Sequence, residues 1–193
     1  MKKLFVLALA LALMLSGSAL AEAFVLENGV AWGMTQGDVL AIEGAGDVEY
    51  ETVGIAEELD VDDTAFRGAE ADADYLFRDD ALAAVVYELD AEDVTPQALA
   101  EALDGEYGAR GAGNEGHFCD LMSALTGRTY AMSAILRTWD FYYDWTGPGG
   151  TYVVLTNRFS NDEDDFYVCF FDEAGLLAGS DAFLSEPAPA LEP

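Results

Sequence analysis

Positively charged side chains are scarce in this chain. Its 193 residues include 8 Lys or Arg and 1 His against 37 Asp or Glu, and the formal net charge is −29. Both lysines lie at the extreme N-terminus, and the histidine is His117. Nucleic acids and anionic membrane surfaces repel such a protein. We therefore expect no nucleic-acid partner.

The first residues have the pattern of a secretory signal peptide. Both lysines precede the apolar run Leu4–Leu15, and small residues before Ala21 stand at the positions that specify cleavage. The run is shorter than the roughly 20 residues that a membrane-spanning helix needs. We expect residues 1–21 to be removed, with cleavage after Ala23 as the alternative. The mature protein is then secreted or periplasmic, with no membrane span.

Removal of this segment limits the chemistry of the remaining chain. Both lysines are lost, so a Schiff-base lysine, a phosphate-loop lysine and a Ser–Lys dyad are excluded. A single histidine cannot build a metal site that needs two. We therefore expect no enzymatic activity, no cofactor and no metal centre.

Cysteine is also scarce, with Cys119 and Cys169 as the only two. An oxidising compartment permits a disulfide between them. The alternative is two buried thiols, because Cys169 lies in the apolar run 166–171 and Cys119 follows Phe118. Both interpretations stay open at this stage.

Capping signals predict three helices. Thr35 is a good N-cap for a helix over 36–43. Thr95 followed by proline predicts a second helix over 96–107. A third helix is expected over 115–126, before a glycine.

Alternation of apolar and polar residues predicts strands in the rest of the chain. The predicted strands cover 48–52, 64–69, 73–78, 82–89, 135–145, 152–156 and 166–171. The order of elements indicates an α+β fold with helices packed on one face of an antiparallel sheet.

One domain is expected over residues 22–175. Its order of elements indicates possible duplicated halves, 32–90 and 95–172, each a helix followed by a meander. Residues 176–193 include an Ala, Pro and Glu-rich end and are expected to form a mobile tail.

The segment Gly33–Gln36, followed by Val39 and Gly44, resembles the opening helix of the small outer-membrane-assembly lipoproteins of the SmpA/OmlA type. It also resembles exported domains that share the fold of β-lactamase inhibitor protein. The resemblance implies tandem helix-plus-meander units that bind other proteins without catalysis. A lipobox cysteine and the inhibitor's interface loops have no counterpart here, so neither membrane attachment nor β-lactamase inhibition is implied.

Four aromatic side chains alternate along the strand that precedes Gly147: Trp139, Phe141, Tyr143 and Trp145. The simplest interpretation is a sheet face that helices bury. If these side chains are exposed, they form an aromatic strip that suits a protein or carbohydrate partner. A binding site is expected there.

Two other groups of residues suggest chemistry. His117 and Cys119 are near in sequence, but positions two apart on a helix point in different directions, so we expect a structural role. The acidic runs 60–63, 72–74 and 161–165 are expected to be solvated turns, with weak calcium binding as the alternative.

The leading hypothesis is an exported, non-enzymatic binding module for an unknown protein or envelope component. Its acidic surface favours basic partners. The alternatives are a weak calcium-binding protein and a secreted glycan hydrolase, whose paired carboxylates need a deep cleft.

Overall fold

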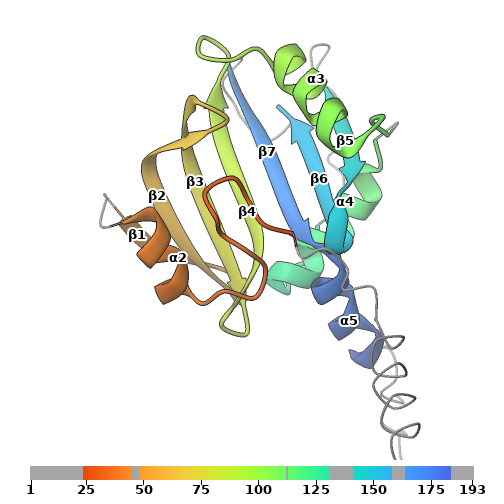
Figure 1. Ribbon diagram of the computed structural model, residues 1–193. Coiled ribbons are helices and arrows are strands. Elements are labelled where there is room, and N and C mark those ends of the chain that lie inside the picture. Colours follow the sequence, from red (N-terminus) through yellow and green to blue (C-terminus); the bar gives the residue numbers. More distant parts are fainter. Residues whose placement is uncertain (1–23, 45–47, 112, 131–140, 158–163, 184–193) are drawn as a thin grey trace, which may run out of the picture.

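The computed structural model describes residues 24–44, 48–111, 113–130, 141–157 and 164–183. These residues form an antiparallel β-sheet with helices packed against it (Figure 1). The predicted α+β class is therefore confirmed. The expected signal peptide, Trp139 and the last ten residues lie outside the described ranges.

Seven strands form one sheet, in the order β1-β2-β3-β4-β7-β6-β5. All neighbouring strands are antiparallel, and two meanders meet where β4 pairs with β7. A helix precedes each meander, but the first meander has one strand more than the second, and a duplication stays a prediction. The strands are β1 (Val48–Val53), β2 (Ala56–Phe66), β3 (Ala69–Arg78), β4 (Ala81–Asp90), β5 (Tyr142–Thr146), β6 (Thr151–Thr156) and β7 (Asp165–Asp172), with the short turn η1 (Pro148–Gly150) between β5 and β6.

The helices begin at local capping signals. The Thr35 side chain accepts a hydrogen bond from the Asp38 backbone N–H, and the Asp38 carboxylate accepts one from the Thr35 N–H, which completes a capping box. The Thr95 side chain likewise accepts from the N–H of Ala98. These helices are α2 (Gln36–Glu43) and α3 (Pro96–Tyr107), followed by α4 (Glu115–Thr126) and α5 (Glu173–Phe183).

A fourth helix changes the prediction for the C-terminal region. The helix α5 starts directly after β7, so residues 176–183 are helical where the sequence predicts a mobile tail. Leu176 is buried in this helix, and its apolar burial anchors the start of α5 on the sheet.

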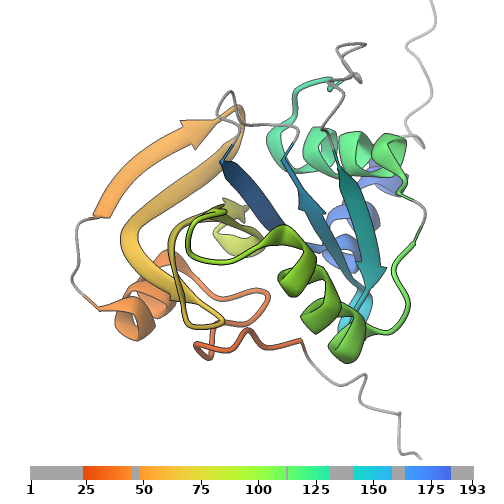
Figure 2. The same cartoon turned by 90° about the horizontal axis from the view of Figure 1, so that it is seen from above.

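The helices lie on both faces of the sheet, which corrects the expected single covered face (Figure 2). One core contains Val39 of α2 and Leu103 of α3, and the other contains Leu121 of α4 and Leu176 of α5. All six residues of β6 are buried, so both faces of the central strands are apolar and each requires its own cover.

The strand β2 is longer than expected. The sequence predicts a strand at 64–69, whereas β2 runs continuously over 56–66 and turns at Arg67 and Gly68, which both have positive φ. Acidic residues on one face of β2 interrupt the apolar pattern by which a strand is recognised in the sequence.

Candidate binding surface

The aromatic strip predicted on β5 is largely covered. Trp145 is 3% exposed and belongs to the main core, and Phe141 and Tyr143 are half-buried against it. Trp139 lies outside the described residues. The three described side chains therefore fit the interpretation of a sheet face that helices bury.

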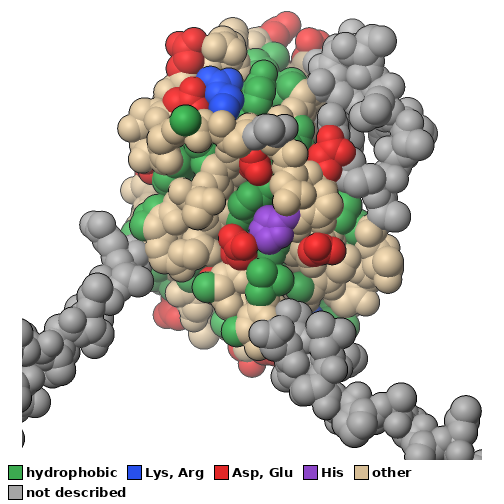
Figure 3. Space-filling view, turned by 90° about the vertical axis from the view of Figure 1, so that its right-hand side faces the viewer, with side chains coloured by type: hydrophobic (Ala, Val, Ile, Leu, Met, Phe, Trp, Pro, Cys, Tyr) green, Lys and Arg blue, Asp and Glu red, His purple; other side chains and the backbone are tan. Residues whose placement is uncertain are grey.

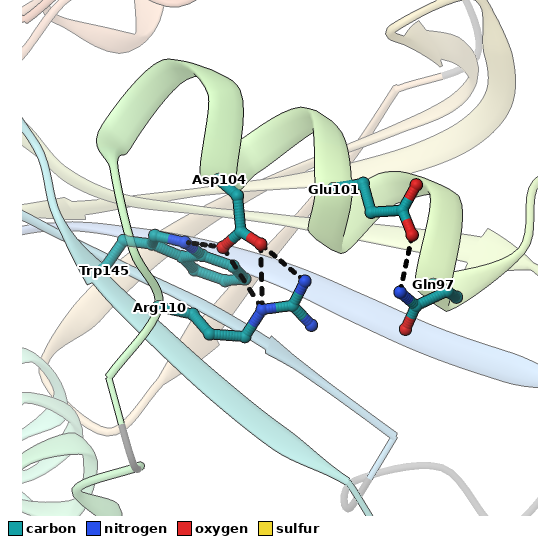
Figure 4. A network of polar contacts seen from close by, with 5 residues as sticks. All are labelled: Gln97, Glu101, Asp104, Arg110 and Trp145. Carbon is teal, nitrogen blue, oxygen red and sulfur yellow. Dashed lines mark hydrogen bonds and ion pairs between the residues drawn. The ribbon is translucent and has the colours of Figure 1, made fainter.

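Polar contacts join this strip to α3 (Figure 4). The Trp145 indole N–H donates to Oδ1 of Asp104 over 3.0 Å, and Nη2 of Arg110 donates to Oδ2 of Asp104 over 2.6 Å. The Arg110 guanidinium also lies 4.7 Å from the centre of the Tyr143 ring. Hydrogen bonds from Arg110 lower the pKa of Asp104 below its usual value. This network attaches α3 to β5.

The sole imidazole forms a similar attachment on the other side of the sheet. Nε2 of His117 lies 3.0 Å from Oε1 of Glu173, and the His117 ring meets the Tyr152 ring edge-on at 4.7 Å. Figure 3 shows the imidazole at the surface between acidic side chains. His117 therefore links α4 to α5 and β6, and its described partner is not Cys119.

Cys119 and Cys169 are not joined by a disulfide in the structure. Cys169 is buried within the core that α4 and α5 cover, and Cys119 is half-buried on α4. Burial raises the pKa of both thiols. The structure thus corresponds to the alternative of two separate thiols.

The outer edge of β5 is covered by the loop that precedes α4. The Gly111 N–H donates to the Asp144 carbonyl over 2.7 Å, and the Gly113 N–H donates to the Asp144 carboxylate over 3.0 Å. The Tyr152 hydroxyl donates to the same carboxylate over 2.8 Å. These hydrogen bonds attach the loop to the outer edge of β5 at Asp144.

The opposite end of the sheet carries a surface that the sequence interpretation missed. Residues paired directly across antiparallel strands share one face, and here carboxylates are paired with carboxylates. Asp60 pairs with both Glu49 and Asp74, Glu51 pairs with Glu58, and Asp72 pairs with Glu88. We name this surface the acidic face: Glu49, Glu51, Glu58, Asp60, Asp72, Asp74 and Glu88.

Among the described residues, no cation neutralises the acidic face. The ion pairs of the described residues use carboxylates outside the acidic face, and their cations are Arg67, Arg78, Arg110 and His117. Burial, followed by the charges of neighbouring carboxylates, raises the pKa of Asp74 to about 7. The fold therefore keeps the carboxylates of the acidic face close together although they repel one another.

The pKa values of three neighbouring carboxylates are raised as well. Burial raises the pKa of Glu58, Asp60 and Glu88, and nearby carboxylates add to the effect. The contribution of Glu51 to Glu58 follows directly from their cross-strand pairing. Charge on any one of these groups therefore costs free energy that a bound cation would offset.

The acidic face lies beside the part of the sheet that α4 and α5 cover. That covered part includes Leu76, Ala84 and Phe171, which pack in the core of these helices. Glu49 and Asp72 are exposed, and Asp74 is half-buried. The described helices thus leave the acidic face accessible.

The strand β1 forms the edge of the acidic face and is itself exposed. Tyr50 at its centre is 61% exposed. A hollow of about 350 Å³ lies along the β1–β2 hairpin. It is lined by Gln36, Tyr50, Glu51, Thr52, Glu57 and Glu58.

The acidic runs predicted as turns lie mostly on strands. Residues 60–63 belong to β2 and 72–74 belong to β3, while 161–163 fall outside the described residues. Within the described ranges, no group of three or more His, Cys, Asp or Glu residues is arranged to hold a metal ion. In the same ranges, no helix is long and apolar enough to cross a membrane.

Comparison of the chain with protein-family models, with curated proteins and with solved structures finds no match. The resemblance to outer-membrane-assembly lipoproteins and to the fold of β-lactamase inhibitor protein therefore stays a prediction. Function has to be inferred from the geometry of the chain itself.

A sequence signal for the acidic face exists in retrospect. Carboxylates stand two residues apart at 49 and 51, at 58 and 60, and at 72 and 74. This period of two places each pair on one face of a strand. Residues 49 and 51 lie in a predicted strand, whereas 60 and 72–74 were assigned to acidic turns, so the shared period of the carboxylates was not recognised.

Proposed function

We propose that this protein is an exported, non-enzymatic binding module whose acidic face holds a basic protein or envelope component. The observation that carries the proposal is the direct cross-strand pairing of carboxylates without a neutralising cation in the described chain. Like charges placed directly opposite each other destabilise a sheet. A surface that retains them gains free energy when a cationic partner docks.

The position of the acidic face supports this proposal. It lies on hydrogen-bonded strands of the sheet, so its carboxylates are fixed on the rigid part of the fold and present a patterned charge. Glu49, Glu51 and Asp72 are exposed and accessible to a partner, whereas Asp74 lies deeper between the strands. Complementary charge of this kind increases the association rate and selects basic partners over acidic ones.

The alternative functions receive less support from the described residues. A glycan hydrolase needs two carboxylates across a deep cleft, whereas the hollow beside β1 lies along the sheet edge. Calcium prefers six to eight oxygen ligands that converge on one point, whereas the carboxylates of the acidic face are spread over four strands. Both alternatives stay less favoured hypotheses.

The proposal is tested with a flexible cationic probe, the blocked peptide Lys-Gly-Lys-Gly-Lys-Gly, by isothermal titration calorimetry at low salt. The variant Glu49→Gln/Asp72→Asn removes two exposed charges of the acidic face. The control Glu92→Gln/Asp93→Asn removes two exposed charges between β4 and α3, so both variants have the same net charge.

We expect the acidic-face variant to bind the probe about fivefold more weakly than the control, because each lost surface ion pair is worth a fraction of a kcal/mol. The difference should shrink at high salt, where exposed charges are screened. Equal affinities for the two variants would show that only net charge matters, and the proposal would then be rejected.

A further inference from the structure

The two edges of the sheet differ in their protection. The edge at β5 is covered, because the loop residues Gly111 and Gly113 donate to Asp144. The edge at β1 pairs with β2 on one side, and no other described backbone group bonds to it. Unpaired edges offer their N–H and C=O groups to another strand, and proteins usually protect them.

The two faces of β1 also differ in chemistry. Glu49 and Glu51 belong to the acidic face, and Tyr50 and Thr52 point to the opposite face because side chains alternate along a strand. Tyr50 and Thr52 line the hollow together with Gln36 of α2. An added strand would therefore meet carboxylates on one side and an exposed aromatic ring on the other.

We propose that the edge of β1 binds an extended basic segment of a partner protein as an additional strand. This inference rests on the proposed function and specifies its binding mode. In the bound segment, Lys or Arg alternate with apolar residues. The cationic side chains lie over Glu49 and Glu51, and the apolar ones lie against Tyr50. Main-chain hydrogen bonds supply affinity and the alternation supplies specificity.

Charge decides between this occupant and a second copy of the chain. Two copies paired through β1 place Glu49 and Glu51 of one beside the same carboxylates of the other, where like charges destabilise the pairing. The formal net charge of −29 opposes self-association further. A cationic segment is instead attracted by Glu49 and Glu51, so charge complementarity favours it as the occupant.

The test uses the blocked peptide Lys-Val-Lys-Val-Lys-Val, whose length equals the six residues of β1. Two control peptides have the same charge: one carries a methyl group on every backbone nitrogen, and the other has the order Lys-Lys-Lys-Val-Val-Val. Affinity is measured by calorimetry. Amide hydrogen exchange in the intact protein reports which backbone N–H groups the peptide protects.

We expect the alternating peptide to bind at least about tenfold more tightly than either control, because each control loses the strand pairing or the sidedness. Exchange should slow at Val48–Val53 and stay unchanged at Tyr142–Thr146. Sedimentation should show a one-to-one complex. Protection without added peptide that rises with protein concentration would instead identify a second copy as the occupant and overturn the inference.

The failure of this inference is distinguishable from the failure of the proposed function. If the methylated peptide binds as tightly as the alternating one, and the Glu49→Gln/Asp72→Asn variant weakens both, the acidic face binds cations without strand addition. The inference then fails and the proposed function stands. If neither peptide distinguishes that variant from its matched control, both fail.

Discussion

Asp74 shows how one residue records the electrostatics of the acidic face. It is half-buried on β3, where Asp60 lies directly opposite and Glu58 and Glu88 lie nearby. Its pKa is raised to about 7, so the folded state binds a proton that the unfolded state releases above about pH 4. The stability contributed by this proton is present at low pH and is lost as the pH rises through 7.

The variant Asp74→Asn is expected to raise the free energy of unfolding by about 2 kcal/mol at pH 8, because it removes a charge that burial and repulsion disfavour. At pH 3.5 the carboxyl group is mostly protonated in both the folded and the unfolded state, so the gain should nearly vanish. Urea denaturation at both pH values measures the effect. Asp93→Asn is the exposed control, and an equal response of the two variants would contradict the origin of the shift.

The burial of single side chains on β5 was harder to predict than the strand itself. The alternation predicts a strand over 135–145, and Tyr143 and Trp145 lie on β5, whereas Phe141 directly precedes it and 135–140 fall outside the described residues. A pattern of this kind does not show which face a helix covers. Asp104 contacts Trp145 across a sequence separation that only the fold closes. The sequence interpretation therefore left burial and binding as alternatives.

At the scale of elements, the β1–β2 turn docks on the C-terminus of α4. The N–H of Ile55 donates to the carbonyl of Thr126 over 2.9 Å, which satisfies one of the last carbonyls of the helix. Gly54 precedes it with φ of +71°, and a Cβ at Gly54 would lie 2.0 Å from the same carbonyl oxygen. This turn therefore requires glycine.

The substitution Gly54→Ala is expected to lower the free energy of unfolding by about 2–3 kcal/mol, because the methyl group strains the turn and pushes it off α4. The matched change Gly105→Ala lies within α3 and meets no atom within 4 Å. It should raise stability by about 0.5–1 kcal/mol. Thermal unfolding followed by circular dichroism compares them, and equal losses in both variants would contradict the role of the turn.

Helices were predictable because their signals are local. Thr35 and Thr95 cap α2 and α3 where the sequence indicates, and the bounds expected for α4 are also confirmed. The extent of β2 and the helix α5 were not predicted. Their residues are ordered by partners distant in the sequence, such as Tyr75 opposite Leu59.

At the scale of the whole molecule, the division of the two sheet faces could not be predicted. The sequence indicates an antiparallel sheet, but the join between β4 and β7 brings together residues about 80 positions apart, such as Val86 and Cys169. That join makes the central strands apolar on both faces and leaves β1–β3 with a polar one. The acidic face is a consequence of this arrangement, so only the fold reveals it.

The same arrangement explains why net charge alone describes this protein poorly. Most described arginines are engaged elsewhere: Arg67 contacts Glu27 and Glu106, and Arg110 contacts Asp104. Within the described residues, the acidic face takes part in no ion pair, and it lies next to an open sheet edge. Charge and unpaired backbone groups coincide on β1, and this coincidence is the basis of the proposed binding mode.

The central claim is that the acidic face binds a cationic partner. Its most direct test is the pKa of Asp74, followed by the carboxyl carbon chemical shift in a pH titration with and without saturating Lys-Gly-Lys-Gly-Lys-Gly peptide. If the cationic peptide docks on the acidic face, its charges favour the ionised carboxylate, and the pKa should fall from about 7 by about one unit. Asp104, which contacts Trp145 at the opposite end of the sheet, provides the internal control. A pKa of Asp74 that stays unchanged while the peptide is bound would place the partner elsewhere and contradict the account.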